Sequence, residues 1–323
     1  MADRYYIGID IGGTKLAVCI ADGKGKILDK LKMPSEAHKG PEQMIDKMFL
    51  MADELMGKYG IKSQDVEAFG ISCGGPLDSK RGIVMSPPNL PGWDNVHITE
   101  IIQERYSRPA YLQNDANACA LAEWMYGAGR GYKNVIFLTF GTGMGAGLIL
   151  DGRLYSGTND MAGEVGHIRL APFGPVGYGK EGSFEGFCSG GGIAQIAAAE
   201  VLKRRQMGME VEFARGLEPE ELTAKIVGEA ADKGDEVAIE ILRISANFLG
   251  LGISILIDIL NPEVIIIGSI YARSIKFFKD IVEEVIKKEA LQRSASVCKV
   301  VPAMLGEQLG DYASIAVAMN RGR

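Results

Sequence analysis

One pattern occurs twice in this chain of 323 residues, and it limits the possible folds more than any other feature. Each copy contains an apolar segment, a Gly/Thr loop, a second apolar segment and an Asp-Gly pair. The copies also share their spacing, because the same 129 positions separate Gly12 from Gly141 and Asp22 from Asp151. An internal repeat at the distance of a whole domain predicts two domains that each begin with a strand, a loop and a strand.

Short apolar segments alternate with helical patterns along both halves, which is typical of an α/β protein. At about 150 residues per domain, the length also fits two domains. We expect a smaller N-terminal domain over residues 1–116 and a larger C-terminal domain over residues 117–323. Strands are predicted over residues 5–10, 16–21, 27–31, 68–72, 110–113, 135–140, 146–150, 264–267 and 296–301. Helices are predicted over residues 41–59, 98–106, 116–126, 190–203, 218–232, 235–260, 274–288 and 310–319.

Composition and charge exclude several classes of protein. The net charge of −6 offers neither nucleic acid nor an anionic membrane a basic surface to bind. The five cysteines are scattered and form no CxxC pair, which favours a reduced, cytoplasmic setting. The N-terminal residues lack the basic and apolar regions of a secretory signal, and the most apolar run, residues 248–260, is too short to cross a bilayer. We therefore expect a cytoplasmic protein with no nucleic-acid or membrane partner.

The first Gly/Thr loop follows a predicted strand that ends in an acidic residue. Gly12 and Gly13 allow a tight turn that brings backbone N–H groups close to a phosphate. Thr14 adds a hydroxyl donor and Lys15 a cation, while Asp10 is placed to hold a hydrated Mg²⁺. Taken alone, the segment is explained almost as well by an ordinary β-turn with a solvated lysine.

The second Gly/Thr loop contains Gly141, Thr142 and Gly143. A dinucleotide-binding fingerprint requires a helix after its glycines, but here an apolar strand and an Asp-Gly turn follow. The second loop is therefore predicted to be a phosphate-binding hairpin, not a dehydrogenase loop. Two such hairpins, one in each half, are suited to hold a nucleoside triphosphate between two domains.

Asn114 and Asp115 lie between a predicted strand and an alanine-rich helix. The structural interpretation is that Asp115 caps the helix. The functional interpretation is that Asp115 accepts a proton from a substrate hydroxyl. The local sequence favours the cap, but the two phosphate loops reverse this preference.

The motifs resemble those of the ROK family, whose name covers repressors, open reading frames and kinases. The resemblance extends over nearly the whole chain and implies an actin-like ATPase fold, a duplicated ribonuclease H-like arrangement of two α/β domains with an interdomain cleft. It also implies a last helix that packs back on the first domain, and a homodimer. The matching segments are Asp10 to Lys15, Asn114 to Ala118, Gly141 to Gly145, Glu164 to His167 and Asn261 to Gly268.

The resemblance assigns a role to each of these segments. Asp115 becomes the catalytic base that deprotonates a sugar hydroxyl, with Asn114 beside it at the substrate. Glu164 and His167 become sugar ligands, and the two Gly/Thr loops hold the phosphates of ATP. The nucleotide site falls in the larger domain, where Gly268 lies near adenine and is followed by serine in place of the usual second glycine.

Two further residues are expected at the sugar. Asn89 lies in a proline-rich loop that resembles a sugar-contacting segment of the family, although a surface turn around a packed Trp93 explains it nearly as well. Glu185 matches the final Glu of the family's zinc knuckle. The three cysteines of that knuckle are absent here, and a structural zinc needs about four ligands. We expect no zinc site, with packing of Tyr178 and Phe184 ordering the loop instead.

The resemblance implies a glucokinase-like, ATP- and Mg²⁺-dependent kinase acting on a hexose or an N-acetylhexosamine. ROK repressors carry a helix-turn-helix before the first loop, but only nine residues precede Asp10 here, so we expect no DNA-binding role. The second alternative is a sugar-sensing regulator with weak or no kinase activity. The intact Asp115 and the two loops favour the kinase.

Overall fold

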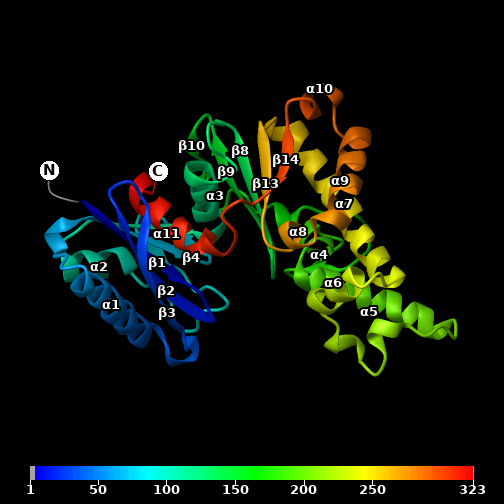
Figure 1. Cartoon of the computed structure of the whole chain (residues 1–323), viewed down its shortest axis with the longest axis horizontal. Helices are drawn as coiled ribbons and strands as arrows, with labels where there is room; N and C mark the ends of the chain where they lie inside the picture. The colour runs from blue at the N-terminus through cyan, green and yellow to red at the C-terminus, as the bar shows by residue number, and fades with distance from the viewer. Residues whose placement is uncertain (1–3, 323) are drawn as a thin grey trace. The chain divides into compact units, whose positions relative to one another are not determined.

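The computed structural model describes residues 4–322 and divides into two compact units (Figure 1). The first unit contains the chain up to residue 133, residues 147–162 and the chain from residue 304 onward. The second unit contains residues 134–146 and 163–303. The C-terminal segment therefore belongs to the same unit as the N-terminal strands.

A five-stranded sheet forms the centre of the first unit, with the strand order β3-β2-β1-β4-β7. The first three strands form an antiparallel meander, and β4 and β7 continue the sheet parallel to β1. The first Gly/Thr loop is the turn of the β1–β2 hairpin, in which Ile11 pairs with Leu16. The strands are β1 (Tyr5–Ile11), β2 (Lys15–Asp22), β3 (Ile27–Pro34), β4 (Val66–Cys73) and β7 (Ala110–Asn114).

The second sheet repeats this order as β10-β9-β8-β13-β14. Strands β9 and β10 are antiparallel, while β13 lies parallel to both β8 and β14. The matching order of the two sheets confirms the internal repeat predicted from the sequence. The strands are β8 (Val135–Phe140), β9 (Met144–Leu150), β10 (Arg153–Leu154), β13 (Val264–Ile267) and β14 (Lys299–Pro302). Two short hairpins form separate two-stranded sheets: β5 (Leu77–Asp78) with β6 (Ile83–Val84), and β11 (Val176–Gly177) with β12 (Lys180–Glu181).

Helices cover the sheet of the first unit. The first helix begins with a proline at its N-terminus and buries Met44, Met48 and Leu55, which are spaced at helical intervals. The last helix lies against β1 and β4, as Figure 1 shows for the red helix beside the blue strands. Its close approach is possible because Gly8 and Gly70 are paired neighbours in the sheet. The helices are α1 (Pro41–Lys58), α2 (Ile98–Tyr106), α3 (Asp115–Tyr126) and α11 (Leu309–Asn320).

The second unit is built around one long helix, α7 (Glu236–Leu260), which packs against several of its neighbours. Within residues 4–322, α7 alone is long and apolar enough to cross a membrane, judged by length and composition. More than half of its apolar stretch, 56%, is buried inside the protein, which is typical of a core helix. The other helices are α4 (Phe184–Phe187), α5 (Gly190–Gln206), α6 (Ala224–Asp232), α8 (Ile270–Arg273), α9 (Ile275–Glu289) and α10 (Gln292–Ala295).

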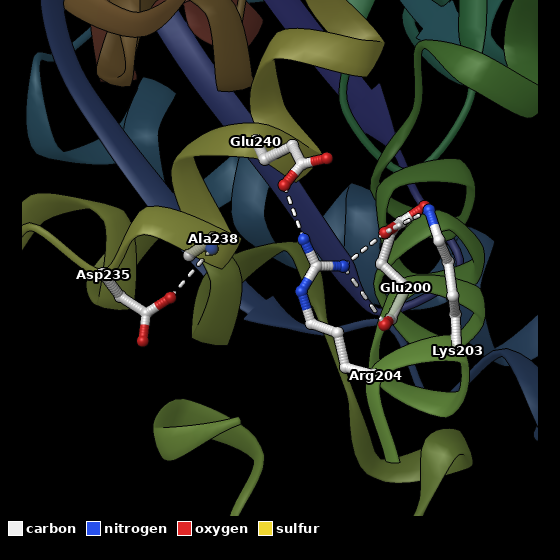
Figure 2. A network of polar contacts seen from close by, with 6 residues as sticks. All are labelled: Glu200, Lys203, Arg204, Asp235, Ala238 and Glu240. Carbon is white, nitrogen blue, oxygen red and sulfur yellow. Dashed lines mark hydrogen bonds and ion pairs between the residues drawn. The ribbon is translucent and has the colours of Figure 1, made fainter. Parts of the chain in front are cut away.

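An ion-pair network joins α5 to α7 (Figure 2). The guanidinium of Arg204 lies between Glu200 of its own helix and Glu240 of α7, at 2.5 Å from the latter. Asp235 caps α7 by accepting a hydrogen bond of 2.9 Å from the Ala238 N–H. The network fixes the ends of the two helices that flank α6.

Most predicted elements agree with the structure to within two or three residues. The predicted helix over residues 218–232 is wrong in its first part, because Pro219 begins a separate 3-10 turn and Thr223 caps α6. The predicted strand over residues 296–301 begins later, at Lys299, after the short helix α10. The 3-10 turns are Ala37–Lys39, Ser63–Asp65, Val165–His167, Glu212–Ala214, Pro219–Glu221 and Gly306–Gln308.

Candidate active site

In the first unit, the parallel strands β1, β4 and β7 bring polar groups to one edge of the sheet. The register pairs Asp10 with Ser72 and Cys73 with Asn114, so the three strands end at the same level. The carboxyl ends of parallel strands are where α/β proteins bind ligands. Asp10 and Asp115 therefore lie at an edge of the kind at which α/β proteins bind ligands.

The first Gly/Thr loop is a tight turn, closed by a hydrogen bond of 3.0 Å from the Gly12 N–H to the Lys15 carbonyl. Asn89 lies directly against this turn. A Cβ atom added to Gly13 would come within 2.6 Å of the Asn89 carbonyl oxygen, so the position admits only glycine. The structure thus places Asn89 beside the first loop, while the buried Trp93 anchors the loop that carries Asn89.

Asn114, not Asp115, caps α3. The side-chain Oδ1 of Asn114 accepts hydrogen bonds of 2.9 Å and 3.2 Å from the Ala116 and Asn117 N–H groups. The cap interpretation of Asp115 was therefore wrong by one residue, because Asn114 has the extended backbone of a cap and Asp115 is already helical. Asp115 also accepts a bond of 2.7 Å from Ala116, and its side chain is accessible to solvent.

The two carboxyl groups at this edge, those of Asp10 and Asp115, both have raised pKa values. Burial, together with the negative charges of Asp115 and Asp311, raises the pKa of Asp10 to about 7, against the opposing effect of Lys32. Surrounding protein also raises the pKa of Asp115, partly offset by its hydrogen bond from Ala116. Carboxylates with raised pKa values at a ligand-binding edge are suited to proton transfer. A divalent cation beside Asp10 would relieve the repulsion among these acidic groups.

In the second unit, the second Gly/Thr loop borders a cavity of about 880 Å³. Gly141 and Thr142 line it from the loop, and the N-terminus of α5 is attached to the loop by a hydrogen bond of 2.7 Å from the Gly190 N–H to the Gly141 carbonyl. The volume and the position at a helix N-terminus fit a nucleotide. The remaining wall is formed by α6 and by the segment from Ser269 to Ser274.

Most of this cavity was not predicted from the sequence. The run of three glycines that follows Ser189 was a usable signal, because Ser189 caps α5 and the glycines leave the helix N-terminus open to a ligand. The contribution of α6 had no comparable motif. Ser269 lines the cavity, whereas the predicted Gly268 packs behind it against Phe137.

The remaining predicted residues of the second unit lie around a 3-10 turn. Glu164 and His167 are exposed at the two ends of this turn. Gly166, between them, packs on the second loop, since a Cβ atom there would come within 2.2 Å of the Met144 carbonyl. Glu185 is joined to the same loop, because its Oε2 accepts a hydrogen bond of 3.0 Å from the Met144 N–H.

The β11–β12 hairpin stands where the family has its zinc knuckle. Lys180 attaches the hairpin to the Glu164–His167 segment by donating a hydrogen bond of 2.6 Å to the His167 carbonyl. The expected packing of Tyr178 is wrong, because its side chain is 80% exposed in the turn. Phe184 is fully buried, as expected, and packs against Gly252 of α7. No group of three or more potential metal ligands occurs among residues 4–322.

The chain matches known proteins over nearly its whole length. The profile of the ROK family matches residues 6–319. The glucokinase of Halalkalibacterium halodurans is 32% identical over 96% of this chain and 93% of that protein. The xylose repressor of Caldicellulosiruptor bescii is 29% identical over 89% of this chain and 70% of that protein. Relatives with enzymatic and with regulatory names are therefore both present.

Solved structures agree with the fold. The ROK hexokinase from Thermus thermophilus has a TM-score of 0.81 and 27% identity, covering 98% of this chain and 99% of that one. A ROK family glucokinase from Streptomyces griseus, in complex with glucose and AMPPNP, has a TM-score of 0.75 and 28% identity, with the same coverage. Together with the repeated sheet, these structures confirm the duplicated α/β, actin-like ATPase fold.

Proposed function

The chain belongs to the ROK family, and on this premise we propose that it is an ATP-dependent kinase acting on a hexose or an N-acetylhexosamine. The observation that carries the proposal is Asp115, a carboxylate with a raised pKa at the sheet edge that also holds Asp10 and the first Gly/Thr loop. The relatives named glucokinase, and the solved glucokinase with glucose and AMPPNP, support the same class of reaction.

Asp115 acts as the general base in this proposal. It accepts the proton of the sugar hydroxyl while that oxygen bonds to the terminal phosphorus of ATP, the bond from this phosphorus to the bridging oxygen breaks, and ADP leaves. Because its pKa is raised, Asp115 is a stronger base than an ordinary aspartate. A positioned base of this kind contributes about 10²- to 10⁴-fold to the rate.

The sugar is held by side chains that can donate or accept hydrogen bonds with several hydroxyl groups. We assign this role to Asn89 and Asn114 in the first unit, and to Glu164, His167 and Glu185 in the second. Asn114 offers its amide nitrogen, since its oxygen caps α3. These groups recognise hydroxyls in general, so they do not by themselves select one sugar.

The nucleotide is assigned to the two Gly/Thr loops and to the cavity of the second unit. When bound, ATP supplies the phosphoryl group and Mg²⁺ neutralises part of the phosphate charge. Gly12, Gly13, Thr14 and Lys15 would hold phosphate oxygens in the first unit, and Asp10 would hold the hydrated Mg²⁺. Gly141, Thr142 and Gly143 would do so in the second unit, with the turn at Gly268 and Ser269 near the base.

The direct test is ADP release by the purified protein with ATP and Mg²⁺ against a panel of hexoses and N-acetylhexosamines. We expect turnover with at least one sugar and formation of the matching sugar phosphate. No turnover with any sugar, while one of them raises the melting temperature, would contradict the kinase and favour a sugar-sensing regulator. The relatives named xylose repressor give that second function its support.

We also propose a cytoplasmic homodimer, as the resemblance implies. The five cysteines are all free, and three of them are buried, which supports a reducing compartment. Light scattering of the purified protein tests the dimer, since a monomer mass near 34.8 kDa would contradict it. We expect no DNA binding. A salt-sensitive gel shift with promoter DNA would contradict this expectation.

A further inference from the structure

Glu185 makes a contact that a sugar ligand does not require. Its Oε2 accepts a hydrogen bond of 3.0 Å from the Met144 N–H, which belongs to the second Gly/Thr loop. Its other carboxylate oxygen, Oε1, accepts no hydrogen bond from the described part of the chain. One carboxylate therefore has one oxygen on the phosphate loop and one oxygen left for a ligand.

Three glycines from three segments surround Glu185. A Cβ atom added to Gly143 would lie 2.8 Å from Glu185 Oε2, and one added to Gly177 would lie 2.7 Å from Glu185 Cβ. A Cβ atom on Gly166 would lie 3.2 Å from Glu185 Cβ and 2.2 Å from the Met144 carbonyl. Glu185 is thus enclosed by the second Gly/Thr loop, the Glu164–His167 segment and the β11–β12 hairpin, and backbone atoms leave no room for a side chain at Gly166 and Gly177.

The short helix that carries Glu185 is itself held firmly. Ser183 caps α4 through a hydrogen bond of 3.0 Å from the Gly186 N–H, and Phe184 is fully buried. The carboxylate is therefore presented from a rigid support. A hydrogen bond between a charged acceptor and a backbone N–H is stronger than a neutral one.

We propose that Glu185 is a positioning residue for the Gly141–Gly145 loop, in addition to its place among the sugar ligands. It holds the Met144 N–H so that the loop keeps its nucleotide-binding shape before any sugar arrives. A sugar hydroxyl at Oε1 would fix the same carboxylate further, which couples sugar binding to nucleotide binding. This inference rests on the proposed function of the two sites.

The test measures nucleotide affinity in the absence of sugar. A residue that only binds sugar would have no effect on this affinity. Isothermal titration of the sugar-free protein with Mg·AMPPNP compares the wild type with Glu185→Ala and Glu185→Gln. We expect about tenfold weaker binding for Glu185→Ala, from loss of a hydrogen bond to a charged group. The Glu185→Gln variant should retain most of the affinity, because its amide oxygen still accepts from Met144.

Two control variants separate this role from neighbouring effects. Glu181→Ala removes a nearby exposed carboxylate on the hairpin and should leave nucleotide binding unchanged. His167→Ala removes a proposed sugar ligand and should weaken binding of the best sugar of the panel while nucleotide affinity stays the same. Equal nucleotide affinity in the wild type and Glu185→Ala would overturn the inference.

A second measurement keeps the inference separate from the proposed function. Hydrogen exchange over residues 140–146 reports the Met144 N–H directly, without any ligand. We expect faster exchange in Glu185→Ala and near-normal exchange in Glu185→Gln. Unchanged exchange in a folded Glu185→Ala protein would overturn the positioning role. A wild type with a protected loop that binds no nucleotide would contradict the kinase instead.

Discussion

At the scale of single residues, the division of labour between Asn114 and Asp115 decides the chemistry. Asn114 uses its side-chain oxygen to cap α3, which leaves the adjacent carboxylate accessible to solvent. The sequence identified the pair but assigned the cap to the wrong member. Asn and Asp are equally good caps, and only the backbone angles distinguish them, with Asn114 extended at φ −63° and ψ 147°.

The raised pKa of Asp115 leads to a prediction about pH. A general base works only when it is ionised, so activity falls as the pH drops through its pKa. We expect the acid limb of kcat/KM to lie clearly above the ordinary aspartate value of about 3.9. A pH–rate profile, with intrinsic fluorescence as a check on folding, measures it. An acid limb at or below pH 4 in the folded protein would contradict the assignment.

At the scale of elements, strands were predictable and the cavity was not. Alternating and continuous apolar runs mark the buried strands, and the two Gly/Thr loops mark their hairpins. The wall contributed by α6 has no motif, because it depends on where α5 and α7 hold that helix. The helix predicted before α6 was wrong because the helical pattern of the sequence extends across Pro219 and the cap at Thr223.

The Arg204 network supports a prediction at this scale. The side chains of Arg204 and Glu200 are only 13% and 16% exposed, so Arg204→Met leaves a poorly solvated carboxylate and should destabilise the protein by about 1–2 kcal/mol. Lys203→Ala is the matched control. The side chain of Lys203 is 63% exposed, and its Nζ lies 3.6 Å from Oε2 of the same Glu200. This variant should change stability by less than about 0.5 kcal/mol. Urea denaturation compares the two, and equal midpoints would argue against the network.

At the scale of the whole molecule, the repeated spacing predicted the duplication. The packing of the last helix against the first sheet was expected only from the family resemblance, because no local pattern indicates it. The 129-residue spacing anticipates two sheets with the same strand order. The contact of α11 with the first sheet joins residues more than 240 positions apart, such as Gly70 and Ser314. Nothing in the sequence near Gly70 distinguishes a glycine needed for this contact from a glycine in an ordinary strand.

This contact predicts the effect of two glycine substitutions. A Cβ atom on Gly70 would lie 2.1 Å from the Ser314 carbonyl and 2.4 Å from the Ala318 nitrogen, both of them backbone atoms. Gly70→Ala should therefore cost about 1–3 kcal/mol or more through overpacking. Gly57→Ala, in α1 with open space around it, should instead stabilise by about 0.5–1 kcal/mol. Urea denaturation of both variants measures the free energy of unfolding. An unchanged free energy in Gly70→Ala would contradict the close packing of α11 against β4.

The central claim is that Asp115 is the base of a sugar kinase, and Asp115→Asn tests it most directly. Asparagine keeps the size of the side chain and removes its basicity. The measurement is the rate of sugar-phosphate formation with the best sugar of the panel, alongside calorimetric binding of that sugar. We predict a loss of about 10²- to 10⁴-fold in kcat with sugar binding preserved. A variant that binds the sugar and still phosphorylates it at the wild-type rate would contradict the account.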